Sequence, residues 1–301
     1  MPEPKKSFKI SELFMSLEGE SLYSSRPTVY IRYGMCNLKC PGFNNPTSSK
    51  SNTGYASITF NPTDYSNITD MPMISMGCDS QYAVNPEFAH TWESMTTDQI
   101  VERLIQIIPH NQWVHPSTKL PVILSLTGGE PMLNAKWFNE LLVHPLMQQC
   151  QHMLIETNCT VPVSISVAGD INEWLCQDSS RKWTWSNSPK LSNSGEEWKK
   201  TIKPAVALSQ NRVMGRAPHQ VDQYFKFVCG AEEQFIEVQK AMAEYYEGEV
   251  TKAPNVWIMP EACSEEQQQA IAQTVAKLCM HYGFLYSHRL QNSLWGNGVG
   301  T

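Results

Sequence analysis

Three cysteines in polar stretches that contain Gly and Pro are the residues of this sequence best suited to chemistry. Cys36 and Cys40 lie in "GMCNLKCPGF", and Cys78 lies in "GCDSQYA" after 37 intervening residues. Thiolates bind soft metal ions and iron–sulfur clusters, but two of them complete neither a cluster nor a closed zinc site. If residues 41–77 form an excursion whose ends return together, Cys78 can join the first pair. Such a closure is feasible because its entropic cost grows only logarithmically with loop length.

Two metal sites are compatible with this spacing. Three thiolates on a 4Fe–4S cluster would leave one iron open to a cofactor, whereas zinc would need a fourth ligand such as His90. The odd total of nine cysteines argues against a disulfide framework. We expect the remaining six to be small buried hydrophobic residues: Cys150, Cys159, Cys176, Cys229, Cys263 and Cys279.

The composition excludes several classes of protein. The 301 residues are 41% hydrophobic and 17% charged, as in a globular protein with a substantial core. A net charge of −6 argues against a basic surface that binds nucleic acid directly. No stretch approaches the roughly 20 apolar residues of a membrane span, and "MPEPKKSFKI" lacks the apolar run of a secretory signal. We therefore expect a cytoplasmic protein without nucleic-acid or membrane partners.

Strand-like and helix-like stretches alternate along the chain, which predicts an α/β protein with a parallel sheet or barrel. Strands are expected at 27–34, 121–131, 152–158, 182–190, 223–230, 255–262 and 284–290, and helices at 96–108, 135–150, 231–247 and 264–283. Thr96 or Thr97 is expected to cap the first helix and Ser264 the last, with Gly283 ending it and Pro145 ending or kinking the second. Residues 41–77 interrupt the alternation, with at most a short strand at 55–60, and their composition fits a lid, a partner surface or a plain insertion.

Polar motifs follow three successive predicted strands. They are "TGGEP" (127–131), "ETNC" (156–159) and "SNSPK" (186–190). Each alone is typical of an ordinary turn, but strand-end loops of a parallel barrel converge on the active site. Gly128 and Gly129 allow the backbone to approach a ligand closely, and Glu130 can accept hydrogen bonds from an amino or ribose group.

Taken in order, these motifs resemble those of the radical S-adenosylmethionine (SAM) superfamily and, within it, the 7-carboxy-7-deazaguanine synthase family. The resemblance rests on "SELFMSLEGES", "VYIRYGMCNLKC", "GCDSQYAVNPEF", "TGGEPML", "IETNCT", "SPKLS", "FKFVC", "VWIMPEA" and "RLQNSLWGN". It implies a single radical SAM domain over 1–301, with 41–77 inserted in the cluster-binding loop. The implied fold is a partial, TIM-like β/α barrel.

The resemblance also implies the roles of individual residues. A 4Fe–4S cluster would be held by Cys36, Cys40 and Cys78, and Mg2+ in part by Ser80. SAM would be bound by Gly128, Gly129, Glu130, Thr157, Asn158, Ser188 and Lys190, and the substrate by Glu18, Glu20, Arg32 and Gln291. Glu18 stands where the family usually has Gln. Gly77 replaces an aromatic residue that packs near the cofactor adenine, a contact that Phe43, Tyr82 or the excursion would then supply.

The implied activity is conversion of 6-carboxy-5,6,7,8-tetrahydropterin to 7-carboxy-7-deazaguanine with loss of ammonia. An electron donor such as flavodoxin and assembly as a homodimer are implied with it. One alternative is a related radical SAM enzyme with another substrate, including an activase that makes a glycyl radical on a partner. The other is a non-catalytic regulatory protein that keeps the same scaffold.

Overall fold

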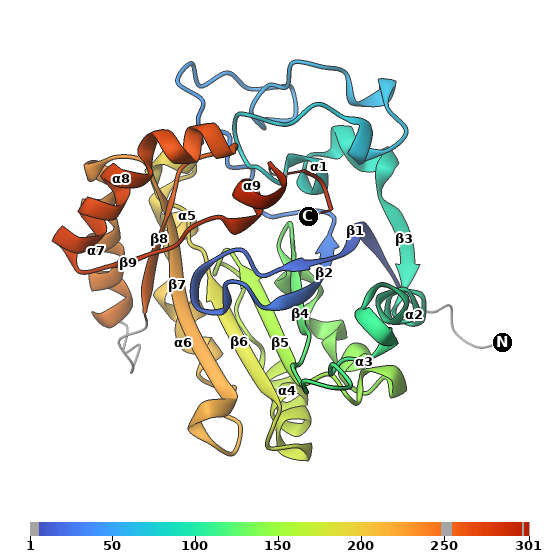
Figure 1. Ribbon diagram of the computed structural model, residues 1–301. Helices are drawn as coiled ribbons and strands as arrows, with labels where there is room; N and C mark the ends of the chain where they lie inside the picture. The colour runs from blue at the N-terminus through green and yellow to red at the C-terminus, as the bar shows by residue number, and fades with distance from the viewer. Residues whose placement is uncertain (1–5, 248–254, 297, 301) are drawn as a thin grey trace.

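A single nine-stranded sheet organises the computed structural model, which describes residues 6–247, 255–296 and 298–300. The strand order is β3-β1-β2-β4-β5-β6-β7-β8-β9. The bounds are β1 Ser7–Leu17, β2 Pro27–Tyr33, β3 Glu93–Thr96, β4 Ile123–Gly128, β5 His152–Thr157, β6 Lys182–Asn187, β7 Val221–Cys229, β8 Val256–Pro260 and β9 Leu285–Tyr286. Neighbours from β2 to β9 are parallel, whereas β1 is antiparallel to both β2 and β3. Within these residues the sheet curves without closing, which confirms the expected partial α/β barrel (Figure 1).

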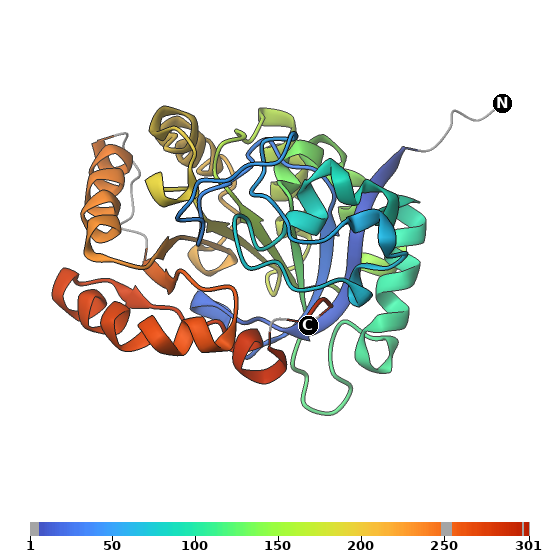
Figure 2. The same ribbon diagram turned by 90° about the horizontal axis from the view of Figure 1, so that it is seen from above.

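Helices cover the outer face of the sheet (Figure 2). The longer ones are α2 Thr97–Ile107, α4 Ile165–Gln177, α7 Glu232–Glu247 and α8 Glu265–Tyr282, and the shorter ones are α1 Gln81–Val84, α3 Phe138–Leu142, α5 Trp198–Thr201, α6 Pro204–Gln210 and α9 Leu290–Trp295. Buried apolar side chains of α2, α3 and α4 pack on β2, β4, β5 and β6 in one core cluster. A second cluster joins α6, α7 and α8 to β7 and β8. Nowhere in the described ranges is a helix both long enough and apolar enough to cross a membrane.

The expected helix ends are confirmed where a capping residue was identified. The Thr96 hydroxyl accepts a hydrogen bond from the Gln99 amide at the start of α2. The Ser264 side chain caps α8 in the same way, and Gly283 ends that helix with a φ of 75°.

Three predictions of secondary structure are wrong in extent. The helix expected at 135–150 is only the five residues of α3, because 3-10 turns that begin at Pro131 and Pro145 flank it. The short strand expected at 55–60 is absent, and a single isolated bridge joins Lys50 to Ala56. The strand expected at 284–290 is reduced to Leu285–Tyr286, after which the chain turns into α9.

Residues 41–77, called here the roof segment, lie over the carboxyl-terminal ends of the parallel strands (blue to cyan at the top of Figure 1). The Gly77 amide donates to the Phe43 carbonyl at 2.6 Å, so the two ends of the excursion meet, as the expected grouping of the three cysteines needs. Ile68 and Ile74 of this segment pack with Tyr82 and Phe88, which follow it in the chain. The roof segment is thus attached to the fold by an apolar cluster of its own.

Candidate functional site

A large pocket lies at the carboxyl-terminal ends of the strands, under the roof segment. Its cavity volume is about 220 Å³, whereas the next pocket found among the described residues has about 10 Å³, roughly the space of one water molecule. Its lining includes every predicted site residue except Glu130: Glu18, Glu20, Arg32, Cys36, Cys40, Cys78, Ser80, Gly128, Gly129, Thr157, Asn158, Ser188, Lys190 and Gln291. Residues separated by more than two hundred positions therefore share one cavity.

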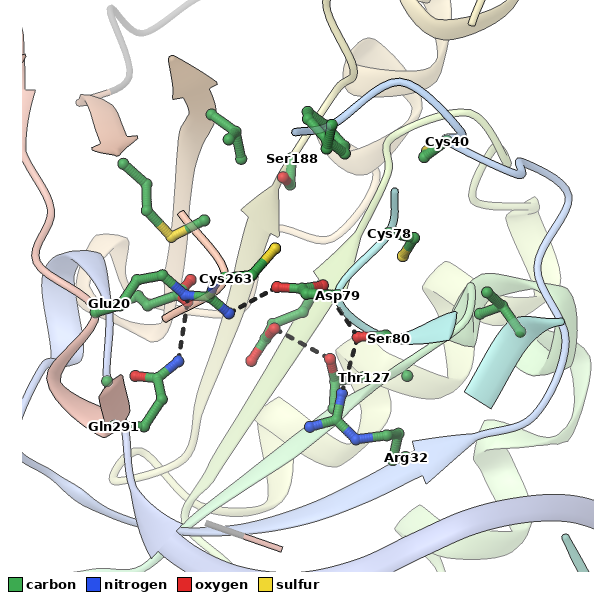
Figure 3. Close-up of a pocket in the computed structure, with 18 of the residues that line it drawn as sticks. Glu20, Arg32, Cys40, Cys78, Asp79, Ser80, Thr127, Ser188, Cys263 and Gln291 are labelled. Carbon is green, nitrogen blue, oxygen red and sulfur yellow. Dashed lines mark hydrogen bonds and ion pairs between the residues drawn. The ribbon is translucent and has the colours of Figure 1, made fainter. Parts of the chain in front are cut away.

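The three cysteines form one wall of this pocket, and Figure 3 shows Cys40 and Cys78 on the same side of it. Burial raises the pKa of the Cys36 thiol to about 11 and that of Cys78 to about 12. The pKa of Cys40 is also raised, first by burial and then by the nearby Cys78. Because like charges oppose ionisation, a positively charged ligand would be needed to stabilise the three thiolates together.

His90 is not placed to be the fourth ligand of the alternative zinc site. His90 lies outside the pocket lining and contacts the Tyr65 carbonyl at 3.1 Å. No group of three or more His, Cys, Asp or Glu side chains in the described part of the chain is placed to hold a metal ion. The cysteines of a 4Fe–4S cluster each bind a different iron, so they do not need to converge on one ion.

Glu196 supports the loop that carries Cys40, although sequence reasoning did not identify it. Its Oε1 accepts hydrogen bonds from the backbone amides of Lys39 at 2.6 Å and Cys40 at 3.0 Å. Cys40 has a φ of 46°, in the left-handed region that non-glycine residues rarely adopt. The carboxylate therefore holds an unfavourable backbone conformation from 156 positions away.

The glycine turn after β4 packs against the cysteine loop itself. The amide of Gly129 donates to the Tyr33 carbonyl at 3.0 Å, and that of Glu130 to the Met35 carbonyl at 3.1 Å. A Cβ on Gly129 would lie 1.7 Å from the Met35 oxygen, so only glycine permits this approach. The close backbone contact expected of this motif is thus made with the chain, and its contact with a ligand stays a prediction.

Glu130 is fully buried behind the wall of the pocket. Its carboxylate accepts hydrogen bonds from the Met132 amide at 3.0 Å, the Thr157 hydroxyl at 2.7 Å and the Asn158 amide at 2.7 Å. Burial raises its pKa to about 7, although these hydrogen bonds act in the opposite direction. Glu130 consequently positions the "ETN" turn, and its predicted contact with the cofactor stays a prediction.

The floor of the pocket is a network of buried charges (Figure 3). Glu20 forms ion pairs with Lys226 and, at 3.3 Å, with Arg289, and it accepts a hydrogen bond from Gln291 at 3.1 Å. Burial alone would raise the pKa of Glu20, but the two cations outweigh it and lower that pKa. Arg289 also binds Asp79 at 2.6 Å. Lys226, Arg289 and Asp79 were absent from the predicted site, and only their positions in the ordered motifs could have indicated them.

Oxygen-containing side chains gather beside Arg32. Its Nε lies 2.7 Å from Glu12, and its Nη1 donates to the Ser80 hydroxyl at 3.3 Å. Ser80 in turn donates to Asp79 at 3.3 Å. Figure 3 shows Asp79 and Ser80 side by side at the edge of the cavity. A hydroxyl next to a carboxylate suits a hard cation.

Gly77 cannot be replaced by an aromatic residue in this fold. Its φ is 75°, and a Cβ would lie 2.6 Å from the Cβ of Ala56 in the roof segment. Phe43 and Tyr82, two of the aromatic residues expected to compensate, both line the pocket.

The sheet and its strand-end pocket define the class of fold as an open, partial α/β barrel. The chain is similar over nearly its whole length to proteins named 7-carboxy-7-deazaguanine synthase. The relative from Halobacterium salinarum is 24% identical over 294 residues, which cover 97% of this chain and 92% of the relative. The relative from Rhodopirellula baltica is 25% identical over 300 residues, or 98% of this chain and 89% of the relative. The resemblance inferred from the motifs is therefore confirmed.

Two further comparisons do not identify a family for this chain. No protein-family model matches the chain. The crystal structure of QueE from Escherichia coli aligns over 93% of both chains with 12% sequence identity and a TM-score of 0.44.

Proposed function

We propose that this protein is a radical SAM enzyme that converts 6-carboxy-5,6,7,8-tetrahydropterin to 7-carboxy-7-deazaguanine with loss of ammonia. The observation that carries the proposal is the pocket that combines three cysteines on one wall with a floor of buried charges. The full-length similarity to 7-carboxy-7-deazaguanine synthases supports the choice of substrate.

The residues present fit a 4Fe–4S cluster and SAM. Three thiols line a buried wall, and the third is brought there by the closure between Phe43 and Gly77. Cys36, Cys40 and Cys78 would hold the cluster, and Thr157, Asn158, Ser188 and Lys190 would line the adjacent SAM site. When bound, the cluster and SAM supply the one-electron chemistry that removes a hydrogen atom from the substrate.

The floor would recognise and orient the substrate. Lys226 and Arg289 supply positive charge for its carboxylate, and Glu20 accepts hydrogen bonds from its ring nitrogens. Gln291 donates to Glu20 at 3.1 Å and lines the pocket beside it, so it would hold this carboxylate in place for the substrate. The roof segment covers this arrangement and would exclude water from the reacting atoms.

The proposed function also includes a Mg2+ ion, for which Ser80 would be one ligand. The Ser80 hydroxyl and the neighbouring Asp79 carboxylate offer hard oxygen ligands at the edge of the floor. An electron donor such as flavodoxin and assembly as a homodimer follow from the resemblance, and a cytoplasmic location, expected from the composition, completes the proposal.

The test compares Cys78→Ala and Cys36→Ala with Cys176→Ala, a matched control on α4 outside the pocket. After anaerobic reconstitution, both pocket variants should lose the cluster, measured as iron and sulfide content, while the control retains it. Full cluster content in Cys78→Ala would overturn the assignment of the third ligand.

Product analysis separates the alternatives. Mass spectrometry after incubation with the carboxytetrahydropterin, SAM and a reductant should detect 7-carboxy-7-deazaguanine. Cleavage of SAM without that product would favour a related radical SAM enzyme. The absence of SAM cleavage would favour a non-catalytic protein.

A further inference from the structure

Residues 192–197, called here the brace loop, lie against the backbone that follows Cys40. The Gly42 amide donates to the Ser194 carbonyl at 2.9 Å. A Cβ on Gly42 would lie 2.4 Å from the Asn193 carbonyl oxygen, so the two backbones meet where only glycine fits. The brace loop therefore fixes the path of the chain as it leaves Cys40.

Glu196 extends this contact to Cys40 itself. Its Oε1 accepts hydrogen bonds from the Lys39 and Cys40 amides, and its Oε2 forms an ion pair with Lys200 at 2.7 Å. The backbone amide of Glu196 donates to the Ser194 hydroxyl at 3.2 Å. Only 7% of the Glu196 side chain is exposed. A buried carboxylate held at both oxygens has a fixed orientation, so it can keep the left-handed backbone of Cys40 in place.

The amide two positions after each cysteine has a different partner at Cys40. The Leu38 amide donates to Sγ of Cys36 at 3.4 Å, and the Cys78 thiol also accepts from the amide two positions after it. The corresponding amide at Cys40 is that of Gly42, which donates to the brace loop instead. The brace loop thus takes up the amide that would otherwise be available to the Cys40 sulfur.

These contacts affect the energy of an electron added to a cluster at these cysteines. An amide hydrogen bond to a cysteine sulfur stabilises the more negative, reduced form of a cluster, whereas a nearby carboxylate destabilises that form. At Cys40 the amide is directed away from the sulfur and a carboxylate lies against the backbone. Both features therefore favour a low reduction potential.

We propose that Glu196 is a positioning residue for the iron–sulfur cluster: it holds the Cys40 loop in the conformation that binds the cluster, and its negative charge lowers the cluster's reduction potential. This inference rests on the cluster of the proposed function and not on its substrate. Glu196 itself would bind neither iron nor substrate, so its effect passes through Cys40.

The test compares wild type with Glu196→Gln, Glu196→Ala and the matched control Glu197→Gln, whose side chain is exposed at the end of the same loop. All four proteins are reconstituted anaerobically. Glutamine retains an oxygen that can accept from both amides but carries no charge. Glu196→Gln should therefore keep the wild-type iron and sulfide content, while its midpoint potential, followed by electron paramagnetic resonance during reductive titration, shifts to a more positive value.

Glu196→Ala removes the acceptor as well as the charge, so it should lose most of its iron and sulfide. Glu197→Gln should match wild type in both measurements, because water and salt screen an exposed charge. The apoprotein gives a readout that needs no cluster. Amide hydrogen exchange at residues 39–42, measured by mass spectrometry, should be roughly tenfold faster in Glu196→Ala than in Glu197→Gln.

A wild-type potential in Glu196→Gln would overturn this inference, and so would wild-type cluster content or unchanged amide exchange in Glu196→Ala. Product formed by wild type would leave the proposed function intact in each of these cases. A wild-type protein that acquires no cluster would overturn the inference and the proposed function together.

Discussion

The peptide unit at Gly129 joins the glycine turn to the cysteine loop with no room for a side chain. Sequence reasoning identified this glycine as a site of close approach, but it named a ligand as the partner. The structure shows a close approach to the Met35 carbonyl, which accepts a hydrogen bond from the Glu130 amide 95 positions downstream, and the contact with a ligand stays a prediction. The residue type thus predicted that the backbone needs glycine at this position. Only the fold revealed that the Met35 carbonyl imposes this need.

We expect Gly129→Ala to lower the free energy of unfolding by about 2 kcal/mol or more, because its Cβ would overlap the Met35 oxygen. The matched control is Gly169→Ala in α4, where a Cβ meets nothing within 4 Å. That change should stabilise the protein by about 0.5–1 kcal/mol. Urea unfolding of both variants measures the effects, and equal stabilities would contradict the steric argument.

The charged residues of the site also depend on contacts that only the fold reveals. Cysteines, paired glycines and strand-end amides have spacings that a sequence displays directly. Glu196 and Lys226 act through partners 156 and 206 positions away, so the residues next to them in the sequence do not reveal these contacts. Their roles depend on the register of the sheet and on loops that no pattern of hydrophobic residues specifies.

At the scale of elements, the roof segment behaves as a packed unit despite its polar composition. Its only Lys or Arg is the exposed Lys50, which gives trypsin one possible cleavage site within it. Ile68 is 8% exposed and packs in the apolar cluster with Ile74, Tyr82 and Phe88. The native protein should therefore resist trypsin at Lys50.

Ile68→Asn should open this segment, since an unpaired amide replaces a buried apolar side chain at a cost of about 2–4 kcal/mol. Trypsin cleavage after Lys50, followed by mass spectrometry, should accelerate at least tenfold. Met73→Asn is the matched control, because Met73 lies in the same segment with 49% of its surface exposed. Equal cleavage rates in the two variants would mean that the cluster does not hold the segment.

The secondary structure was predictable where a hydrophobic run ends in a recognisable signal. Strands β4 and β5 are largely apolar and end in the "TGGEP" and "ETNC" motifs, and α8 has Ser264 and Gly283 at its ends. Helix α3 was overestimated because prolines at both sides restrict it to a single short turn of α-helix. Strand β3 and the antiparallel setting of β1 depend on tertiary pairing with each other, which local sequence does not encode.

For the whole molecule, buried carboxyl groups link stability to pH. The pKa of Glu130 is about 7 in the folded protein and has a reference value of 4.5, so the folded state binds this proton more tightly. Its contribution to stability is therefore fully present below a pH of about 4.5 and is lost as the pH rises through about 7. The shift corresponds to roughly 3 kcal/mol.

We expect the difference in unfolding free energy between wild type and Glu130→Gln to fall by about 3 kcal/mol between pH of about 4.5 and 8. Glutamine does not titrate, so subtraction removes the contributions of other groups and any constant effect of the substitution. Urea unfolding at several pH values gives the difference directly. A difference that stays constant with pH would show that Glu130 ionises normally in the fold.

The closure between Phe43 and Gly77 also has a consequence for protein engineering. Because the two backbones already meet at 2.6 Å, we expect that the chain between them can be exchanged if the replacement keeps Tyr55, whose cluster packs against Cys36 and Cys78. The position is thus a natural graft site. A peptide transplanted there would lie directly above the cavity and could be selected to admit larger substrates.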